Sequence, residues 1–368
     1  MILYINGNYP NHSLHSELVL KLAQLGNEIT VFAPMRGQER EGLYPCDHPS
    51  VNVIYCDCLN YSDRILFIAK IHRIAKIIEQ QIDLSQVDCI LAGTVYSDGA
   101  VAYLLHKKYS IPFSVAVRET DVTYQMRYRP YLNNYIKQLL SHATKIIFLS
   151  PAYKQYFEKF GVNQEKFAVI PNAVNDFWFR QEKRDRILHK PLSLIFVGEI
   201  SKRKNVRTAI LSVAELNSRH IQTELHIIGS GAEEKNCRIV AKQLGIEKKI
   251  LFHGWQEGKE SIKAFYDQAD IFVMLSHRET FGTVYIEALS QGLPVLYTKG
   301  QGIDGYFEEG SVGYGCDPVD VSDAVDKVIR IANSYTSMSK QCIMASRQFC
   351  WEIVANQYND VINTMRKQ

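Results

Sequence analysis

The stretch IFVMLSHRETFGTVYIEALSQGLPVLYT (271–298) holds a complete strand–helix–strand pattern. It opens on an uninterrupted apolar run at 271–275 and closes on a second one that follows Pro294. Between them, residues 281–291 place their apolar side chains on one face of a helix, at 100° per residue. Strands joined in this way run parallel, so the stretch predicts a parallel sheet covered by helices on both faces.

The same alternation extends over the rest of the chain. Short runs rich in aliphatic and β-branched residues recur, and helical patterns fill the gaps between them. These further strand candidates lie at 192–199, 224–231 and 249–255 in the second half and at 2–7, 28–34, 52–56, 89–94, 113–119 and 145–150 in the first half.

A proline and a run of charged residues interrupt this pattern at AVIPNAVNDFWFRQEKRDR (168–186). A chain of 368 residues is also long for a single core. We therefore predict two Rossmann-like, doubly wound α/β domains, residues 1–172 and 173–350, followed by a helix at 351–368. Ligands of such sheets bind beyond the carboxyl ends of the strands, so we expect a cleft where the two domains face each other.

Composition argues against several classes of protein. The net charge of +3 gives no indication of nucleic-acid binding. No apolar run is long enough to span a bilayer, and MILYINGNYP (1–10) lacks the basic and apolar regions of a signal peptide. The eight cysteines form no CxxC pair, so we expect reduced thiols in a cytoplasmic protein.

Three cations, Lys202, Arg203 and Lys204, stand between an apolar run and a helical pattern that begins near Asn205. Cations at a helix N-terminus oppose the helix dipole, at a cost of up to about 1 kcal/mol each. An anion bound there would offset that cost, because helix N-termini and basic side chains both bind phosphate. We interpret the cluster as a phosphate site, and the alternative is a solvated basic turn.

The next predicted strand ends in GSGAEEKN (229–236), which looks like a phosphate loop but lacks the third glycine of GxGxxG. Glu233 and Glu234 begin the following helical pattern, where they suit the helix dipole and would repel phosphate. We therefore predict a structural turn, which argues against a dinucleotide-dependent dehydrogenase.

Two glutamates flank the helical pattern of the opening stretch. Glu279 precedes it, Glu287 lies on its polar face, and the amides of Phe281, Gly282 and Thr283 would be unpaired donors of its first turn. Each carboxylate has an ordinary explanation, since Glu279 suits the helix dipole and Glu287 suits solvent. A catalytic pair and a ligand clamp both stay open at this point.

At this point the residues resemble a known family. ETFGTVYIE (279–287) is similar to the signature of the retaining glycosyltransferases of family 4, which have the GT-B fold. VGEISKRKN (197–205) resembles the donor-phosphate segment of that family, and VIPNAV (169–174) resembles its linker. FCWEIVANQY (349–358) resembles its C-terminal helix, which in this fold returns to the first domain, and the first half matches through its strand pattern and RETDV (118–122).

The resemblance implies roles for the matching positions on the donor side. Glu279 would contact hydroxyls of the donor sugar, and Glu287 would hold the ribose of the nucleotide. Lys204 would neutralise the departing diphosphate, since a fixed cation stabilises charge that develops in a transition state. The remaining donor-binding positions implied are Gly198, Lys202, Arg203, Phe281, Gly282 and Thr283.

The family also implies the class of reaction. A UDP- or GDP-linked sugar would be the donor substrate, no cofactor and no metal would be required, and the sugar would pass with retention to a glycan or a lipid-linked acceptor. Bacterial synthesis of surface polysaccharide, such as capsule, lipopolysaccharide or exopolysaccharide, is the expected setting.

Three positions depart from the family pattern. Glu199 follows Gly198 where the family has arginine, and Lys202 or Arg203 is left to supply that charge. Arg118 stands where histidine is common, and a guanidinium cannot act as a base but can bind an acidic group on the acceptor. The paired glycines of the first loop are replaced by NYPN (8–11). The candidate residues on the acceptor side are Asn8, His15, Arg118 and Asp121.

Two segments, 61–81 and 127–140, mix basic residues with many apolar ones. Such segments are typical of helices that lie on an anionic membrane surface, here the inner face of the cell membrane. The alternative is a helix that packs on the sheet and exposes a basic face to solvent.

Other function classes stay open. A glycoside hydrolase would use Glu279 and Glu287 as acid and base, since helical rise separates their backbones by roughly 9 to 12 Å. That interpretation leaves the basic cluster unexplained. A non-catalytic protein would bind the nucleotide sugar without transferring it, and an epimerase of the GT-B fold fits the motifs less well.

Overall fold

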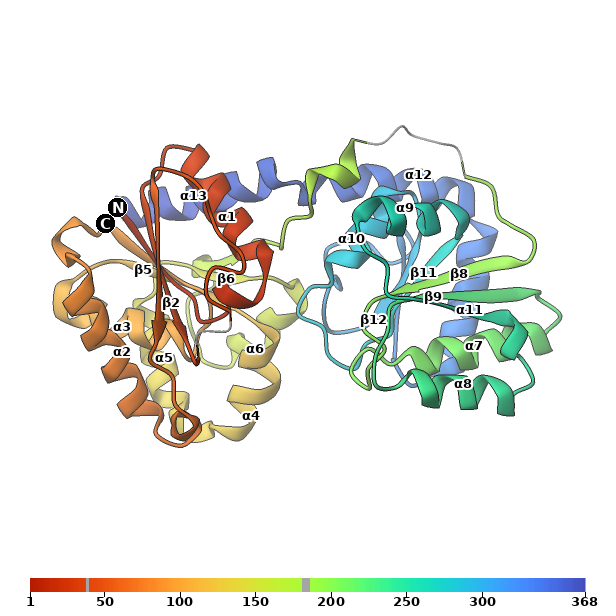
Figure 1. The fold of residues 1–368 in the computed structure, drawn as a ribbon, viewed down its shortest axis with the longest axis horizontal. Coiled ribbons are helices and arrows are strands. Elements are labelled where there is room, and N and C mark those ends of the chain that lie inside the picture. Colours follow the sequence, from red (N-terminus) through yellow and green to blue (C-terminus); the bar gives the residue numbers. More distant parts are fainter. Residues whose placement is uncertain (38–39, 181–185, 368) are drawn as a thin grey trace. The chain divides into compact units, whose positions relative to one another are not determined.

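The computed structural model describes residues 1–37, 40–180 and 186–367, which form two compact units. The first unit contains residues 1–149 and 153–172 together with the C-terminal helix from Trp351, and the second contains residues 150–152 and 173–350. Each unit is built on one parallel sheet, so the predicted fold class is confirmed. Figure 1 shows the helices arranged around the strands of each sheet.

The first sheet has seven parallel strands in the order β3-β2-β1-β4-β5-β6-β7. The chain starts at β1, moves outward to β3, and then restarts on the other side of β1 with β4, so the sheet reverses its order between β1 and β4. Its strands are β1 (Ile2–Ile5), β2 (Ile29–Met35), β3 (Val51–Asp57), β4 (Cys89–Ala92), β5 (Phe113–Val117), β6 (Ile146–Phe148) and β7 (Phe167–Val169). Sequence reasoning missed β7, because its last two residues were assigned to the proline-containing segment between the domains.

The helices of the first unit cover both faces of this sheet. Figure 1 shows α2 and α3 on one side of the strands and α1 on the other, and α1 packs against α13. The indole nitrogen of Trp351, the first residue of α13, donates to Glu17 Oε2 at 2.7 Å. The helices are α1 (Ser13–Gln24), α2 (Phe67–Gln81), α3 (Asp98–Tyr109), α4 (Met126–Tyr128), α5 (Asn133–His142), α6 (Lys154–Glu158) and α13 (Trp351–Arg366).

The second sheet repeats this order with six parallel strands, β10-β9-β8-β11-β12-β13. It reverses between β8 and β11, as the first sheet does between β1 and β4. Its strands are β8 (Leu192–Val197), β9 (Thr223–Ile228), β10 (Ile250–Gly254), β11 (Ile271–Val273), β12 (Val295–Thr298) and β13 (Gly313–Cys316). Sequence reasoning missed β13 because two of its four residues are glycine, which is rare in strands.

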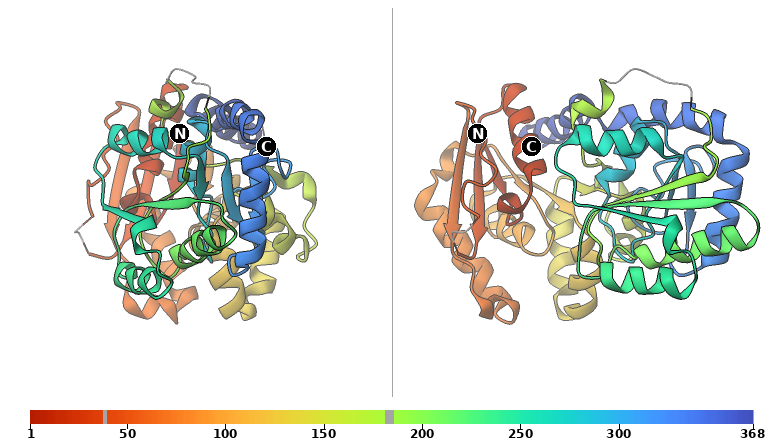
Figure 2. Two further views of the ribbon diagram at one scale, coloured as in Figure 1. Left: turned by 90° about the vertical axis from the view of Figure 1, so that its right-hand side faces the viewer. Right: turned by 45° about the vertical axis from the view of Figure 1, so that its right-hand side comes forward.

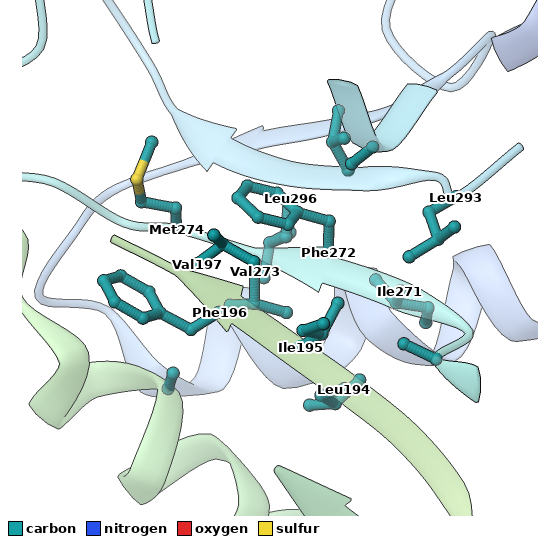
Figure 3. Close-up of a cluster of buried hydrophobic side chains, with 14 of the residues drawn as sticks. Leu194, Ile195, Phe196, Val197, Ile271, Phe272, Val273, Met274, Leu293 and Leu296 are labelled. Atoms are coloured by element: carbon teal, nitrogen blue, oxygen red, sulfur yellow. The ribbon is translucent and has the colours of Figure 1, made fainter. Parts of the chain in front are cut away.

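The second sheet is also covered on both faces. Figures 1 and 2 show α9 and α10 on one side of it and α7 and α8 on the other. The helices are α7 (Val206–Ser218), α8 (Glu234–Gln243), α9 (Lys259–Gln268), α10 (Thr283–Ser290), α11 (Val321–Asn333) and α12 (Tyr335–Ser346). Figure 3 shows side chains of β8 and β11, among them Phe196 and Phe272, in the core of this unit. Burying each such side chain stabilises the fold by roughly 1.5 to 3 kcal/mol.

The segment 61–81 forms the short 3₁₀-helix η2 (Tyr61–Arg64) and α2. The apolar face of α2, including Ile71, Ile74 and Ile78, is buried in the core of the first unit. The apolar face of α2 is therefore packed inside the first unit, and contact of this segment with a membrane stays a prediction. Within the described residues, no helix has both the length and the apolar character needed to cross a membrane.

Candidate active site

The carboxyl ends of β8 and β11 lie side by side, because these two strands pair in the sheet. The basic cluster follows β8 and the segment with Glu279 follows β11. Doubly wound sheets bind ligands at the point where the strand order reverses, and β8 and β11 flank that point. The topology of the second unit therefore brings together two motifs that are 75 positions apart in the chain.

Glu279 and Lys204 form the central contact of this site. Lys204 Nζ donates to Glu279 Oε2 at 2.6 Å, and Arg203 Nη1 lies 3.9 Å from the same oxygen. The side chains of Lys204 and Glu279 are only 12% and 9% exposed, so water screens their attraction weakly. Of the three cations, only Lys202 is exposed, so a solvated basic turn does not describe the whole cluster.

Hydrogen bonds to backbone atoms connect the loop after β8 with the loop after β11. The His277 N–H donates to the Arg203 carbonyl at 2.8 Å, and the Glu279 N–H donates to Gln301 Oε1 at 2.7 Å. Arg203 Nη1 also donates to the Arg278 carbonyl at 3.2 Å. These bonds limit the positions that the Glu279 carboxylate and the Lys204 ammonium can take, which is what a preorganised site requires.

The helix after Glu279 begins at Thr283 and not, as predicted, at Phe281. Gly282 has φ +81°, a conformation outside the right-handed helix, and it ends the loop that precedes α10. Phe281 lies in that loop with its ring buried against Tyr306 and Phe349. Of the three amides assigned to the first helical turn, only that of Thr283 belongs to the helix.

Glu287 lies on α10 and is half-buried, so it is less solvated than its position on the polar face suggests. Burial raises the pKa of its carboxyl to about 7, although the charge of Lys259 acts in the opposite direction. The carboxyl therefore holds its proton more firmly in the folded chain than in the unfolded one.

We expect Glu287→Gln to stabilise the protein in a pH-dependent way. An unfolded chain releases this proton near pH 4.5 and the folded one near pH 7, so stability falls as the pH rises through that window. The variant should gain about 1 kcal/mol at pH 8, allowing for partial exposure, and almost nothing at pH 4.5. Urea unfolding at the two pH values measures this, with the exposed Glu308→Gln as control. An equal gain at both pH values would contradict it.

The two glycines of the GSG turn after β9 are explained by close backbone contacts. A Cβ on Gly229, which has φ +136°, would lie 2.0 Å from the Gly198 carbonyl oxygen, and one on Gly231 would lie 2.3 Å from that of Ile200. The Gly198 N–H in turn donates to the Ile228 carbonyl at 2.9 Å. A structural role is sufficient for this turn.

Gly229→Ala should therefore destabilise the protein by about 2 to 5 kcal/mol, from the sum of backbone strain and steric overlap. Gly245→Ala is the matched control, because Gly245 also has a positive φ but a Cβ there would meet nothing within 4 Å. Its cost should be about 1 kcal/mol. Urea midpoints measure both, and equal losses would show that the close contact adds nothing.

Arg118 and Asp121 meet near the carboxyl end of β5 in the first unit. The Arg118 N–H donates to Asp121 Oδ2 at 2.9 Å, and its Nε donates to the Gly93 carbonyl at 3.0 Å. Asp121 also accepts from the N–H groups of Val95 and Tyr96, each at 3.3 Å. Burial raises the pKa of Asp121 to about 6, and these amides oppose the shift. Asp121 thus ties two loops together.

The other two acceptor-side candidates differ in environment. His15 is buried in α1 with Nδ1 3.3 Å from the Tyr4 hydroxyl oxygen, and burial holds its pKa well below the usual range. Its imidazole is therefore neutral at pH 7. Asn8 is exposed, and its N–H donates to Asn6 Oδ1 at 2.8 Å in the loop after β1.

Sequence reasoning missed Asp98, which lies in the first turn of α3, near the reversal point between β1 and β4. It accepts from the Gly7 N–H at 3.3 Å and from Thr94 Oγ1 at 3.0 Å, and burial raises its pKa to about 6. The signal that could have identified Asp98 is the sequence YSDG (96–99), shortly after the strand candidate at 89–94. Across the described residues, no group of histidine, cysteine and acidic side chains is arranged to hold a metal ion.

Comparison with known proteins assigns both units to one class. Residues 179–349 match the family model for glycosyl transferases group 1, and residues 16–176 match the model for glycosyltransferase family 4. The N-acetyl-alpha-D-glucosaminyl L-malate synthase of Bacillus anthracis is 23% identical over 62% of this chain and 65% of its own length. The lipopolysaccharide core biosynthesis glycosyltransferase LpsE of Rhizobium meliloti is 33% identical over 35% of each chain.

Solved structures resemble the whole chain. Anabaena HepE in complex with UDP has a TM-score of 0.75 at 16% identity, over 99% of both chains, which is a likeness of fold. The matches to the two curated relatives span between 35% and 65% of the relatives' length.

Proposed function

Because the chain belongs to glycosyltransferase family 4, we propose that it transfers a sugar from a nucleoside-diphosphate sugar to a glycan or lipid-linked acceptor, with retention of configuration. The contact between Lys204 and Glu279 at the reversal point of the second sheet carries this proposal. In this proposal the ammonium neutralises the leaving diphosphate, and the carboxylate beside it positions the sugar.

On the donor side, Lys204 and Arg203 bind the diphosphate, with Lys202 at the exposed end of the cluster. The amides of residues 281–283 offer backbone donors, and Glu287 accepts from the ribose hydroxyls. Gly198, whose N–H is bonded to the Ile228 carbonyl, follows β8 directly and lets the backbone approach the donor closely. As the bond between sugar and phosphate breaks, negative charge grows on the diphosphate, and Lys204 stabilises it. The UDP bound to HepE supports a uridine diphosphate donor, and a guanosine diphosphate donor is the alternative.

In the mechanism we propose, the acceptor hydroxyl attacks the face that the leaving group departs from, and a phosphate oxygen takes its proton. No protein nucleophile is then required, and Glu279 positions the sugar. A cofactor and a metal ion are likewise not needed, because the fixed cations carry the charge of the diphosphate.

The acceptor belongs, in this proposal, to a bacterial surface polysaccharide, and the name of the Rhizobium relative supports that setting. The protein would act in the cytoplasm, at the inner face of the membrane. Around 61–81 and 127–140, several large side chains are exposed to solvent, among them Tyr61, Ile65, Leu66, Tyr128 and Tyr131. Such side chains, next to basic residues, are typical of an interfacial contact.

A thermal-shift screen of uridine and guanosine diphosphates and their sugars, followed by a transfer assay, tests the proposal. We expect one nucleotide to bind and its sugar to be transferred. Cleavage of a glycoside without nucleotide would instead favour the hydrolase, and nucleotide-sugar binding without transfer or hydrolysis would favour a binding protein.

A further inference from the structure

A cationic cavity in the first unit is lined by none of the proposed donor residues. Its volume is about 580 Å³, within the range of small-molecule sites, and four of its lining residues are Arg36, Arg64, Lys70 and Arg129. They come from the end of β2, from η2, from α2 and from the residue after α4. The tertiary fold therefore collects four positive charges around one space.

The acidic residue lining the cavity is Asp63, and its oxygens are already engaged. Arg73 Nη2 lies 2.7 Å from both carboxylate oxygens, and the Asn60 N–H donates to Oδ2 at 2.7 Å. The negative charge of Asp63 is thus mainly balanced by the guanidinium of Arg73, which does not line the cavity. The lining keeps a large excess of positive charge.

Arg129 is the most deeply buried of the four cations, with 8% of its surface exposed. Its Nη2 donates to the Arg64 carbonyl at 2.8 Å, and its guanidinium lies 5.3 Å from the centre of the Phe67 ring. Within the described residues it forms no ion pair. A buried guanidinium with only a carbonyl and a ring as partners loses more hydration than those contacts return.

Lys70 repeats this pattern on α2. Its Nζ donates to Ser97 Oγ at 2.6 Å, and burial lowers its pKa. Asp98 and Asp63 offset its charge from beyond ion-pair distance, whereas Arg129 and Arg73 repel it. Two like charges in one partly buried space are unfavourable unless an anion joins them.

We propose that this cavity binds a phosphate or diphosphate group of the acceptor, with Lys70 and Arg129 as its inner ligands and Arg36 and Arg64 at its exposed edge. The inference rests on the proposed function, since it assigns the group to the acceptor of that reaction. Guanidinium groups match the geometry of phosphate oxygens, which makes arginine well suited to this task.

The surroundings of the cavity favour a phosphate that carries an apolar chain. Tyr61 and Ile65 are 77% and 82% exposed, and they flank Arg64 closely in sequence. Tyr128, next to Arg129, is 60% exposed. Large exposed side chains next to cationic ones are typical of contact with lipid.

Two probes separate the sources of the phosphate: inorganic pyrophosphate in solution, and phosphatidylcholine vesicles with or without phosphatidic acid. Binding is measured by calorimetry and by vesicle flotation, in a Lys204→Ala background that weakens the donor site. Lys70→Gln and Arg129→Gln should each lower affinity for pyrophosphate or for phosphatidic acid vesicles about tenfold. Lys76→Gln on α2 and Arg127→Gln on α4 are the controls, because both residues are exposed and do not line the cavity.

Stability gives a second, independent readout. Each cavity variant removes a poorly compensated charge, so the ligand-free protein should melt at the same or a higher temperature. Residues with only a structural role would lower the melting temperature on substitution.

Loss of binding confined to the two cavity variants supports the inference, and the probe that binds identifies a soluble or a lipid-borne phosphate. Absence of binding to both probes, or equal loss in the exposed controls, overturns it. Nucleoside diphosphate binding to the chain with Lys204 intact is measured in parallel. Its absence would overturn the proposed function, whereas intact nucleotide binding without phosphate binding would overturn only the cavity.

Discussion

Glu279→Ala is expected to lower the rate of sugar transfer about 1,000-fold while nucleoside diphosphate affinity stays within about threefold of wild type. The carboxylate would act on the sugar and not on the nucleotide. Its loss also frees the Lys204 ammonium, now held at 2.6 Å, to bind the diphosphate. Single-turnover transfer and calorimetric titration measure the two quantities.

The exposed Glu308→Ala is the control for this variant, because Glu308 lies outside the motif and its side chain is open to solvent. It should transfer at the wild-type rate. Near-normal transfer by Glu279→Ala would overturn the assignment of the sugar site. A fall in nucleotide affinity as large as the fall in rate would mean that Glu279 holds the nucleotide instead.

Lys204→Ala is expected to weaken nucleoside diphosphate binding about 10- to 100-fold, since a hydrogen bond to a charged group contributes about 1.5 to 3 kcal/mol. The rate with bound donor should fall further, because the same ammonium stabilises charge that grows as the diphosphate leaves. Titration with the diphosphate and single-turnover transfer at saturating donor separate the two effects.

The exposed Lys235→Ala on α8 is the control for general loss of positive charge. A double variant of Lys204 and Glu279 should transfer no more slowly than the worse single variant, because residues that act as a unit are not additive. Unchanged diphosphate affinity in Lys204→Ala would remove this lysine from the donor site.

Salt should matter less at this site than at an exposed ion pair. Lys204 and Glu279 are both almost fully covered, so their attraction is poorly screened, whereas Lys202 stands in solvent. Neighbouring cations in one run therefore differ in exposure. For this reason the sequence of a basic cluster does not show whether it is a binding site or a solvated turn. Burial fixes the position of Lys204, whereas Lys202 stays at the solvent-exposed end of the cluster.

Much of the fold could be predicted from the sequence. The alternation of apolar runs and helical patterns predicted parallel sheets, and the order of the segments predicted that the basic cluster and Glu279 each follow a strand. The exceptions have local causes: β7 ends two residues before the proline of the segment between the domains, β13 is rich in glycine, and the positive φ of Gly282 delays α10 to Thr283. Each lies where backbone conformation and not hydrophobic period decides the structure.

The candidate site was predictable only in part. Glu279 and Lys204 were each identified by motif, yet their direct contact depends on β8 and β11 being neighbours. The cationic cavity was not predicted at all, because its cations belong to four separate segments. Strand order and helix packing determine which distant residues come into contact. Neither can be predicted from a local sequence pattern.

The sequence by itself determined the class of fold, the division into two domains of doubly wound type, and the residue types available for the chemistry. Periodicity suffices for these, because hydrophobic burial acts on every strand and helix in the same way. The tertiary structure alone decided that Lys204 is paired, that Glu287 is half-buried, and that Lys70 and Arg129 share a cavity. Charge and hydration depend on what lies within a few ångströms, and neighbours at that distance come from segments far apart in the chain.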